Sequence, residues 1–159
     1  MNNLLLLLLL ITANIFAAYT KNDASQDFIF PKWRELHKIN KALLHSHDHH
    51  AAVDIYTNEI ATKPYIEQQS FFPEGSVILK PLYKKNSRRS YLARLVVMVK
   101  MHKGYDTKNS DWWYGVYDKT GTDVWFEGKI KSCIQCHEIA KKSDYLFTEK
   151  VMEEIEFQE

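Results

Sequence analysis

The stretch "FPEGSVILKPLYKKNSRRSYLARLVVMVKMH", residues 72–102, contains two runs rich in β-branched and aromatic residues. The first run extends from Ser76 to Tyr83 after a Pro-Glu-Gly turn, and the second from about Tyr91 to His102. Valine, isoleucine and tyrosine are enriched in strands, whereas glycine and proline favour turns. The stretch predicts two antiparallel strands joined by the charged loop "KKNSRR", which is also a candidate docking face for an acidic redox partner.

The same signals continue after this stretch. "WWYGVYD" and "DVWFEGKI" flank the turn "KTGT", so residues 119–122 are predicted to join two strands, with Gly121 supplying the turn conformation. A helix-like segment begins at "SCIQCH", and "TEKVMEEIEFQE" is predicted to form a terminal helix.

Upstream of residue 72 the pattern favours one longer helix and two short elements. Apolar residues recur at roughly helical spacing after Pro31, which predicts an amphipathic helix over residues 31–44 packed on the sheet. "AAVDIYTN" predicts a short strand, and "NEIATKPYI" a helix capped by Asn58 and disturbed at Pro64. The chain therefore predicts an α+β fold, mainly antiparallel β-sheet flanked by a few helices, in a single domain over residues 31–159.

The first eighteen residues, "MNNLLLLLLLITANIFAA", differ from the rest of the chain. Their apolar run is shorter than the about 20 residues of a spanning helix, and Ala17 and Ala18 suit a signal-peptidase site. Because no lysine or arginine precedes the run, an uncleaved membrane tether remains an alternative. We expect residues 1–18 to be a signal peptide and residues 19–30 a polar leader, which makes the protein periplasmic.

Composition limits the classes of function. With 159 residues, 45% of them hydrophobic and 13% aromatic, the chain is long enough to form one globular core. Its formal net charge of +1 argues against a nucleic-acid binder, which usually carries a basic stripe.

The only two cysteines, Cys133 and Cys136, belong to the string "CIQCH" with His137. A disulfide between them would close a very small loop and stabilise little, and a zinc site needs about four ligands. A thioredoxin-like redox pair belongs to a βαβ pattern, which this chain lacks. The string also has the chemistry of covalent haem attachment, in which two thiols add to the vinyl groups and the adjacent histidine ligates iron. Export and the absence of other cysteines favour a single covalent haem c, with zinc and redox chemistry as alternatives.

Several blocks, in this order, make a more specific pattern than the string alone: "FPEGSVILK", "LVVMVK", "GYDTKNSDWWYGVYD", "GKIKSCIQCH" and "KSDYLFT". Over most of the mature chain, from about residue 53 to Thr148, they resemble the cytochrome P-460 family. The resemblance implies an exported c-type cytochrome built mainly of antiparallel sheet and usually dimeric. It also implies five-coordinate iron, with His137 as the proximal ligand and the opposite position open.

The resemblance assigns further residues and an activity. Some members of the family oxidise hydroxylamine, and relatives called cytochromes c′-beta bind nitric oxide (NO). A lysine cross-linked to the porphyrin edge in the enzymes matches Lys80, and the position of a carboxylate above the open iron face reads Val96. Valine cannot accept a proton, so an apolar distal wall favours NO or a related nitrogen oxide over hydroxylamine. Met98, two residues on, shares that side of the strand and is a candidate distal ligand or a core residue.

Two other functions stay open on the residues alone. The first is a simple monohaem electron carrier without a substrate. The second is a metal-binding structural module that uses Cys133, Cys136 and the tract "HSHDHH", in which His45, His47, His49 and His50 surround Asp48.

Overall fold

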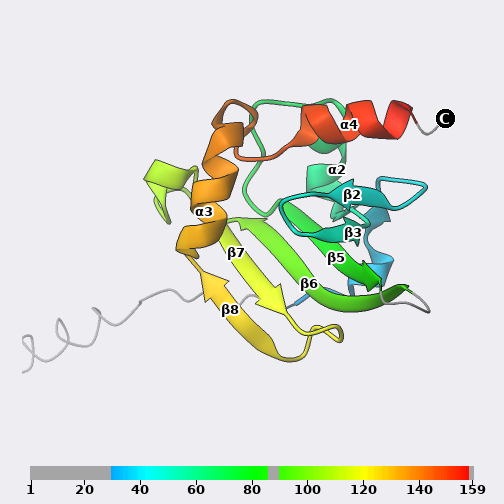
Figure 1. The fold of residues 1–159 in the computed structure, drawn as a ribbon. Coiled ribbons are helices and arrows are strands. Elements are labelled where there is room, and N and C mark those ends of the chain that lie inside the picture. Colours follow the sequence, from blue (N-terminus) through cyan, green and yellow to red (C-terminus); the bar gives the residue numbers. More distant parts are fainter. Residues whose placement is uncertain (1–29, 86–89, 158–159) are drawn as a thin grey trace, which may run out of the picture.

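The computed structural model describes residues 30–85 and 90–157, and an open sheet of eight strands forms its centre (Figure 1). The main path of the sheet runs β1-β4-β5-β6-β7-β8, with β2 paired to β3 and β3 also to β5. Every pairing is antiparallel, which confirms the predicted α+β class. The strands are β1 (His37–Lys38), β2 (Leu44–Ser46), β3 (Ala51–Val53), β4 (Tyr56–Thr57), β5 (Val77–Lys85), β6 (Ser90–Lys100), β7 (Trp112–Tyr117) and β8 (Val124–Gly128).

Helices and short 3-10 turns cover the sheet. In Figure 1, α3 and α4 lie on the same side of the molecule as the hairpin of β2 and β3. Within the two described ranges, no helix combines the length and the apolar character needed to cross a bilayer. The helical elements are η1 (Trp33–Glu35), α2 (Glu59–Ile66), η2 (Thr107–Asn109), α3 (Lys131–His137), η3 (Glu138–Ser143) and α4 (Thr148–Glu156).

The two long predicted strands are β5 and β6, and they form the middle of the sheet. Proline lacks the backbone N–H of a strand ladder, yet Pro81 lies inside β5. Of the described strands on its other side, β4 pairs with the first part of β5 and β3 with the last part, and neither pairs with Lys80 or Pro81. The proline therefore lies where pairing is already interrupted.

Side chains along each strand project alternately to the two faces of the sheet. Both of these faces are packed. On one face, the core includes Ile78, Leu82, Met98 and Tyr114, with α3 and α4 packed against it. On the other face, Leu79, Leu95, Val97 and Tyr117 pack against the N-terminal segment, which contributes Phe30, Trp33 and Leu36.

The predicted helix over residues 31–44 is wrong. The segment forms η1, β1 and the start of β2. It crosses from one core to the other: Trp33 packs in the core on the face of the sheet away from α3, and Leu44 packs in the core on the face that α3 covers. Asn40 fixes this path, since its side chain donates to the Ala42 carbonyl (2.7 Å) and accepts from the Ile55 N–H (2.7 Å). Side-chain bonds to the backbone of this kind compete with helix formation.

Two local predictions are confirmed, the helix cap at Asn58 and the turn conformation at Gly121. Asn58 caps α2 by accepting a hydrogen bond from the Ala61 N–H at 3.2 Å, and the helix continues through Pro64 before it ends at Ile66. Gly121 has φ of 83° in the β7–β8 turn. The signal peptide predicted at 1–18, residues 19–29 of the leader and most of the loop at 84–89 lie outside the described residues.

Candidate haem site

A cavity of about 280 Å³ lies between the sheet, α3, α4 and the β2–β3 hairpin. The residues singled out in the sequence come together there, although they are spread over more than fifty positions of the chain. The cavity-lining residues include Lys80, Val96, Met98, Cys133, Cys136 and His137. A second, more open hollow between η1 and α2 holds none of these six residues.

The sheet contributes one wall through the register of its strands. Lys80 of β5 lies opposite Val96 of β6, which lies opposite Val116 of β7. Two pairs along, Met98 lies opposite Tyr114. Residues opposite one another, and residues two apart on a strand, project to the same face. Among these five residues, only Lys80 with its amine and Tyr114 with its hydroxyl carry a polar group.

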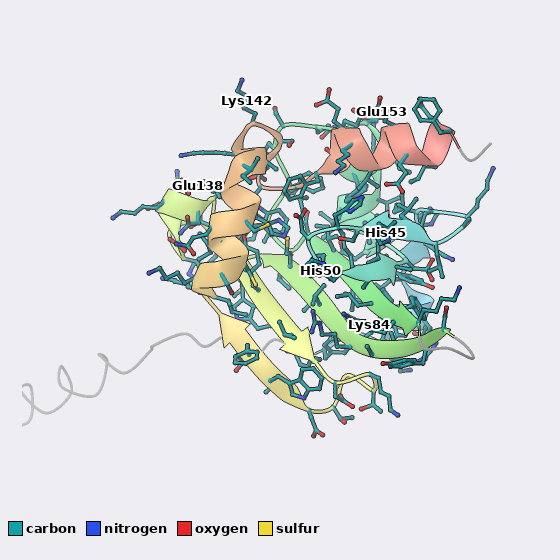
Figure 2. All side chains as sticks on the ribbon, in the orientation of Figure 1. His45, His50, Lys84, Glu138, Lys142 and Glu153 are labelled. Atoms are coloured by element: carbon teal, nitrogen blue, oxygen red, sulfur yellow. The ribbon has the colours of Figure 1, made fainter. Side chains whose placement is uncertain are left out.

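Helix α3 contributes the second wall. Cys136 and His137 follow Cys133 by three and four residues, which places both on the same face of the helix as Cys133. Glu138, the next residue, lies on the solvent side (Figure 2). Both cysteines are free thiols, and burial raises the pKa of each. Reactive redox pairs depend instead on a lowered thiol pKa, so the electrostatics disfavour a thioredoxin-like role.

His137 is held as a neutral imidazole. Its Nδ1 lies 2.6 Å from the Tyr145 carbonyl oxygen, which can only accept, so Nδ1 carries the proton and Nε2 keeps its lone pair. Burial lowers the pKa of His137 to about 4; the Tyr145 carbonyl opposes that shift, and Lys80 adds to it. The rings of Tyr114 (5.6 Å) and Phe147 (5.4 Å) pack edge-on against the imidazole. A backbone carbonyl on the far nitrogen is the usual second contact of a metal-binding histidine.

A buried ion pair holds the turn that carries the Tyr145 carbonyl. Asp144 and Tyr145 both have left-handed backbone angles, with φ of 52° and 67°. The Asp144 carboxylate accepts from the Lys100 ammonium (2.7 and 2.8 Å), the Phe72 N–H (2.8 Å) and the Ser110 hydroxyl. The indole of Trp112 donates to the Asp144 carbonyl at 2.8 Å. The position of His137 therefore depends on this network.

Lys80 is the cation of the sheet wall. Burial lowers its pKa to about 8, and Asp48 of the hairpin opposes that shift. A substantial fraction of the amine is consequently neutral near pH 8, which is the form that can act as a nucleophile.

The histidine tract forms a third side of the cavity. His45, His47, Asp48 and His49 line it, and α4 closes the same side through a hydrogen bond from the His45 N–H to Glu154 (3.3 Å). In the parts of the chain that the structure describes, no three His, Cys, Asp or Glu side chains are arranged to hold a metal ion. We therefore assign no metal to this tract.

These residues fit a haem. Two thiols and a neutral histidine with a free Nε2 lie on one wall of the cavity, which is the donor set that covalent haem requires. The Tyr114 hydroxyl is buried on the opposite wall without a hydrogen-bond partner among the described residues. Buried polar groups are nearly always paired, so an unpaired one at a cavity wall suggests a missing ligand.

Sequence reasoning missed several residues of the cavity. Val116 joins the wall only through the β6–β7 register, and the role of Tyr145 lies in its backbone carbonyl, which no side-chain pattern reports. Phe147 belongs to the quoted block "KSDYLFT" but was not singled out.

Comparison with known proteins agrees with this geometry. No curated protein matches the chain. Residues 31–148 match the model of the Cytochrome P460 family, and they include the cysteines, His137 and all eight strands. The match covers most of the chain and implies a haem cofactor with its iron. The chain therefore belongs to the cytochrome P460 family.

Proposed function

We propose that the protein carries one covalent haem c and binds or converts NO or a related nitrogen oxide. Cys133 and Cys136 would form the thioethers, each by adding its S–H across a vinyl group with no atom lost, and His137 would ligate iron through Nε2. The bound haem would supply an iron centre that binds diatomic ligands and exchanges electrons.

The observation that carries this proposal is the apolar sheet wall opposite α3. By the family resemblance, Val96 matches the position where the hydroxylamine-oxidising members have a carboxylate; in the sheet it lies opposite Val116 and two residues from Met98. The carboxylates that do line the cavity, Asp48 and Glu154, come from the hairpin and α4. Without a carboxylate on the sheet wall, a neutral diatomic ligand is favoured over hydroxylamine.

Lys80 is the candidate for a bond to the porphyrin edge. Such a bond would replace one N–H and one C–H, so its formation needs a two-electron oxidant such as a peroxide. The lowered pKa of Lys80, about 8, supports its reactivity.

The test is expression of the chain together with a haem-maturation system. We expect haem staining to stay with the polypeptide in denaturing electrophoresis and to disappear in Cys133→Ser/Cys136→Ser. We also expect a ferric spectrum of five-coordinate iron that changes when NO is added. A six-coordinate spectrum that NO leaves unchanged would favour the alternative, a simple electron carrier, and colourless protein would refute both.

Export and self-association complete the proposal. Residues 1–18 would direct the chain to the periplasm, and mass spectrometry of the mature protein would locate the cleavage after Ala18. A homodimer is supported by β8, an edge strand on which Trp125 is 50% and Phe126 65% exposed. Exposed apolar edge strands commonly mark interfaces.

A further inference from the structure

Three histidines of the tract line the cavity, and one of them, on the turn between β2 and β3, is half-buried. His49 is half-buried and lines the cavity, whereas His45, His47 and His50 are exposed. Figure 2 labels His45 and His50 on this hairpin, which extends from below α4 toward α3. The tract is thus not uniformly solvated, and His49 is the member that differs.

The neighbours of His49 show where in the cavity its ring lies. The charges that act on it belong to Lys80 of β5, His137 of α3, Arg94 of β6 and Asp48 of the same turn. Lys80 is the direct cross-strand partner of Val96. His49 therefore lines the same cavity as the Lys80–Val96 pair of the sheet and as His137 of α3, and it is within electrostatic reach of both Lys80 and His137.

The state of the ring suits hydrogen bonding to a ligand. Burial, Lys80, His137 and Arg94 lower the pKa of His49 to about 4, against the opposing effect of Asp48, so the imidazole is neutral at pH 7. A neutral imidazole has one N–H donor and one acceptor nitrogen. Among the described residues, no hydrogen bond engages the His49 ring, although the ring is half-buried.

The other polar groups of the cavity are less suited to this task. Tyr114 packs against the His137 ring at 5.6 Å, which places it beside the proximal ligand. Lys80 would lose donor capacity if it formed the proposed bond to the porphyrin. Of the tract histidines that line the cavity, His45 and His47 are exposed, whereas His49 is half-buried.

We propose that His49 is the distal hydrogen-bond donor of this site: from the β2–β3 turn its N–H contacts a diatomic ligand at the open iron position. From the β2–β3 turn, His49 thereby supplies a polar group in place of the carboxylate that β6 lacks at Val96. This inference rests on the proposed function.

The test is the infrared carbonyl stretch of the ferrous holoprotein with carbon monoxide, together with the rate at which NO dissociates. A donor polarises the bound ligand, so His49→Leu should raise the carbonyl stretch. Loss of one neutral hydrogen bond should speed NO dissociation about fivefold. His49→Gln keeps an N–H donor and should restore much of both values, which separates the hydrogen bond from a structural effect. His50→Leu, on the exposed neighbour, is the matched control.

The possible outcomes distinguish failure of this inference from failure of the proposed function. A carbonyl stretch and an NO dissociation rate equal in His49→Leu and wild type would overturn the role of His49 and leave NO binding intact. A six-coordinate ferrous wild type that becomes five-coordinate in His49→Leu would also overturn it, because His49 would then ligate iron. If neither CO nor NO binds the wild-type holoprotein, both the inference and the proposed function fail.

Discussion

Replacing Lys100 by methionine should destabilise the protein strongly. Lys100 and Asp144 form an ion pair of 2.7 Å, and their side chains are only 6% and 3% exposed. Methionine has a similar length but no charge, so the substitution leaves a buried carboxylate without its cation. Removing one partner of a buried ion pair costs about 3–5 kcal/mol.

The remaining contacts of Asp144 place the expected loss of stability at the lower end of this range. The Phe72 N–H and the Ser110 hydroxyl would still donate to the carboxylate. We therefore expect a loss of about 3 kcal/mol, which corresponds to a melting temperature lowered by roughly 10 °C for a chain of this size. Lys63→Met is the control, because the Lys63–Glu67 pair is 76% and 50% exposed and such pairs contribute about 0.5 kcal/mol or less.

The assay is urea unfolding of the holoprotein, followed by circular dichroism. The double variant Lys100→Met/Asp144→Asn removes both charges and should recover at least about 1 kcal/mol relative to Lys100→Met. The reasoning is refuted if Lys100→Met costs no more than Lys63→Met, or if the double variant is less stable than the single one.

Three further predictions concern the cavity and the sheet edge. After denaturation, the Lys80→Ala holoprotein should have the spectrum of ordinary haem c. The spectra of wild type and of the exposed control Lys85→Ala should differ from it. If denatured wild type and Lys80→Ala have identical spectra, no cross-link exists. Because the pKa of His49 is about 4 in the fold, against about 6.5 unfolded, protonation favours the unfolded chain and stability falls as the pH drops from 6.5 toward 4. His49→Gln should lose less unfolding free energy than wild type between pH 7 and pH 4, and parallel urea midpoints would contradict this. Phe126→Lys should shift the protein toward monomer in sedimentation, whereas Phe157→Lys, an exposed control at 84%, should not; a wild-type monomer would rule the dimer out.

The sequence predicted the elements whose signals are local. The strands β5 to β8, the turn at Gly121 and the terminal helix follow from β-branched runs, a glycine and an amphipathic pattern. The segment 31–44 could not be predicted in this way. Its apolar spacing is roughly helical, but Trp33 and Leu44 pack into different cores, and only the tertiary structure reveals that division.

The candidate site shows the same limit. Cys133, Cys136 and His137 are adjacent in the sequence, so their shared helix face was predictable. Lys80 and Val96 were identified through the family resemblance, and their direct opposition appears only in the strand register. The selection of His49 from its neighbours depends on which side of a short turn faces inward, which composition does not encode.

The pairing gap at Lys80 and Pro81 has a mechanical consequence for β5. Ile78 and Leu79 before the gap, and Leu82 and Tyr83 after it, are paired on both sides, but here only β6 pairs with β5 among the described strands. A displacement of Lys80 toward a ligand would thus break few inter-strand bonds. The interruption thus coincides with the residue whose amine lies directly across from Val96 in the sheet.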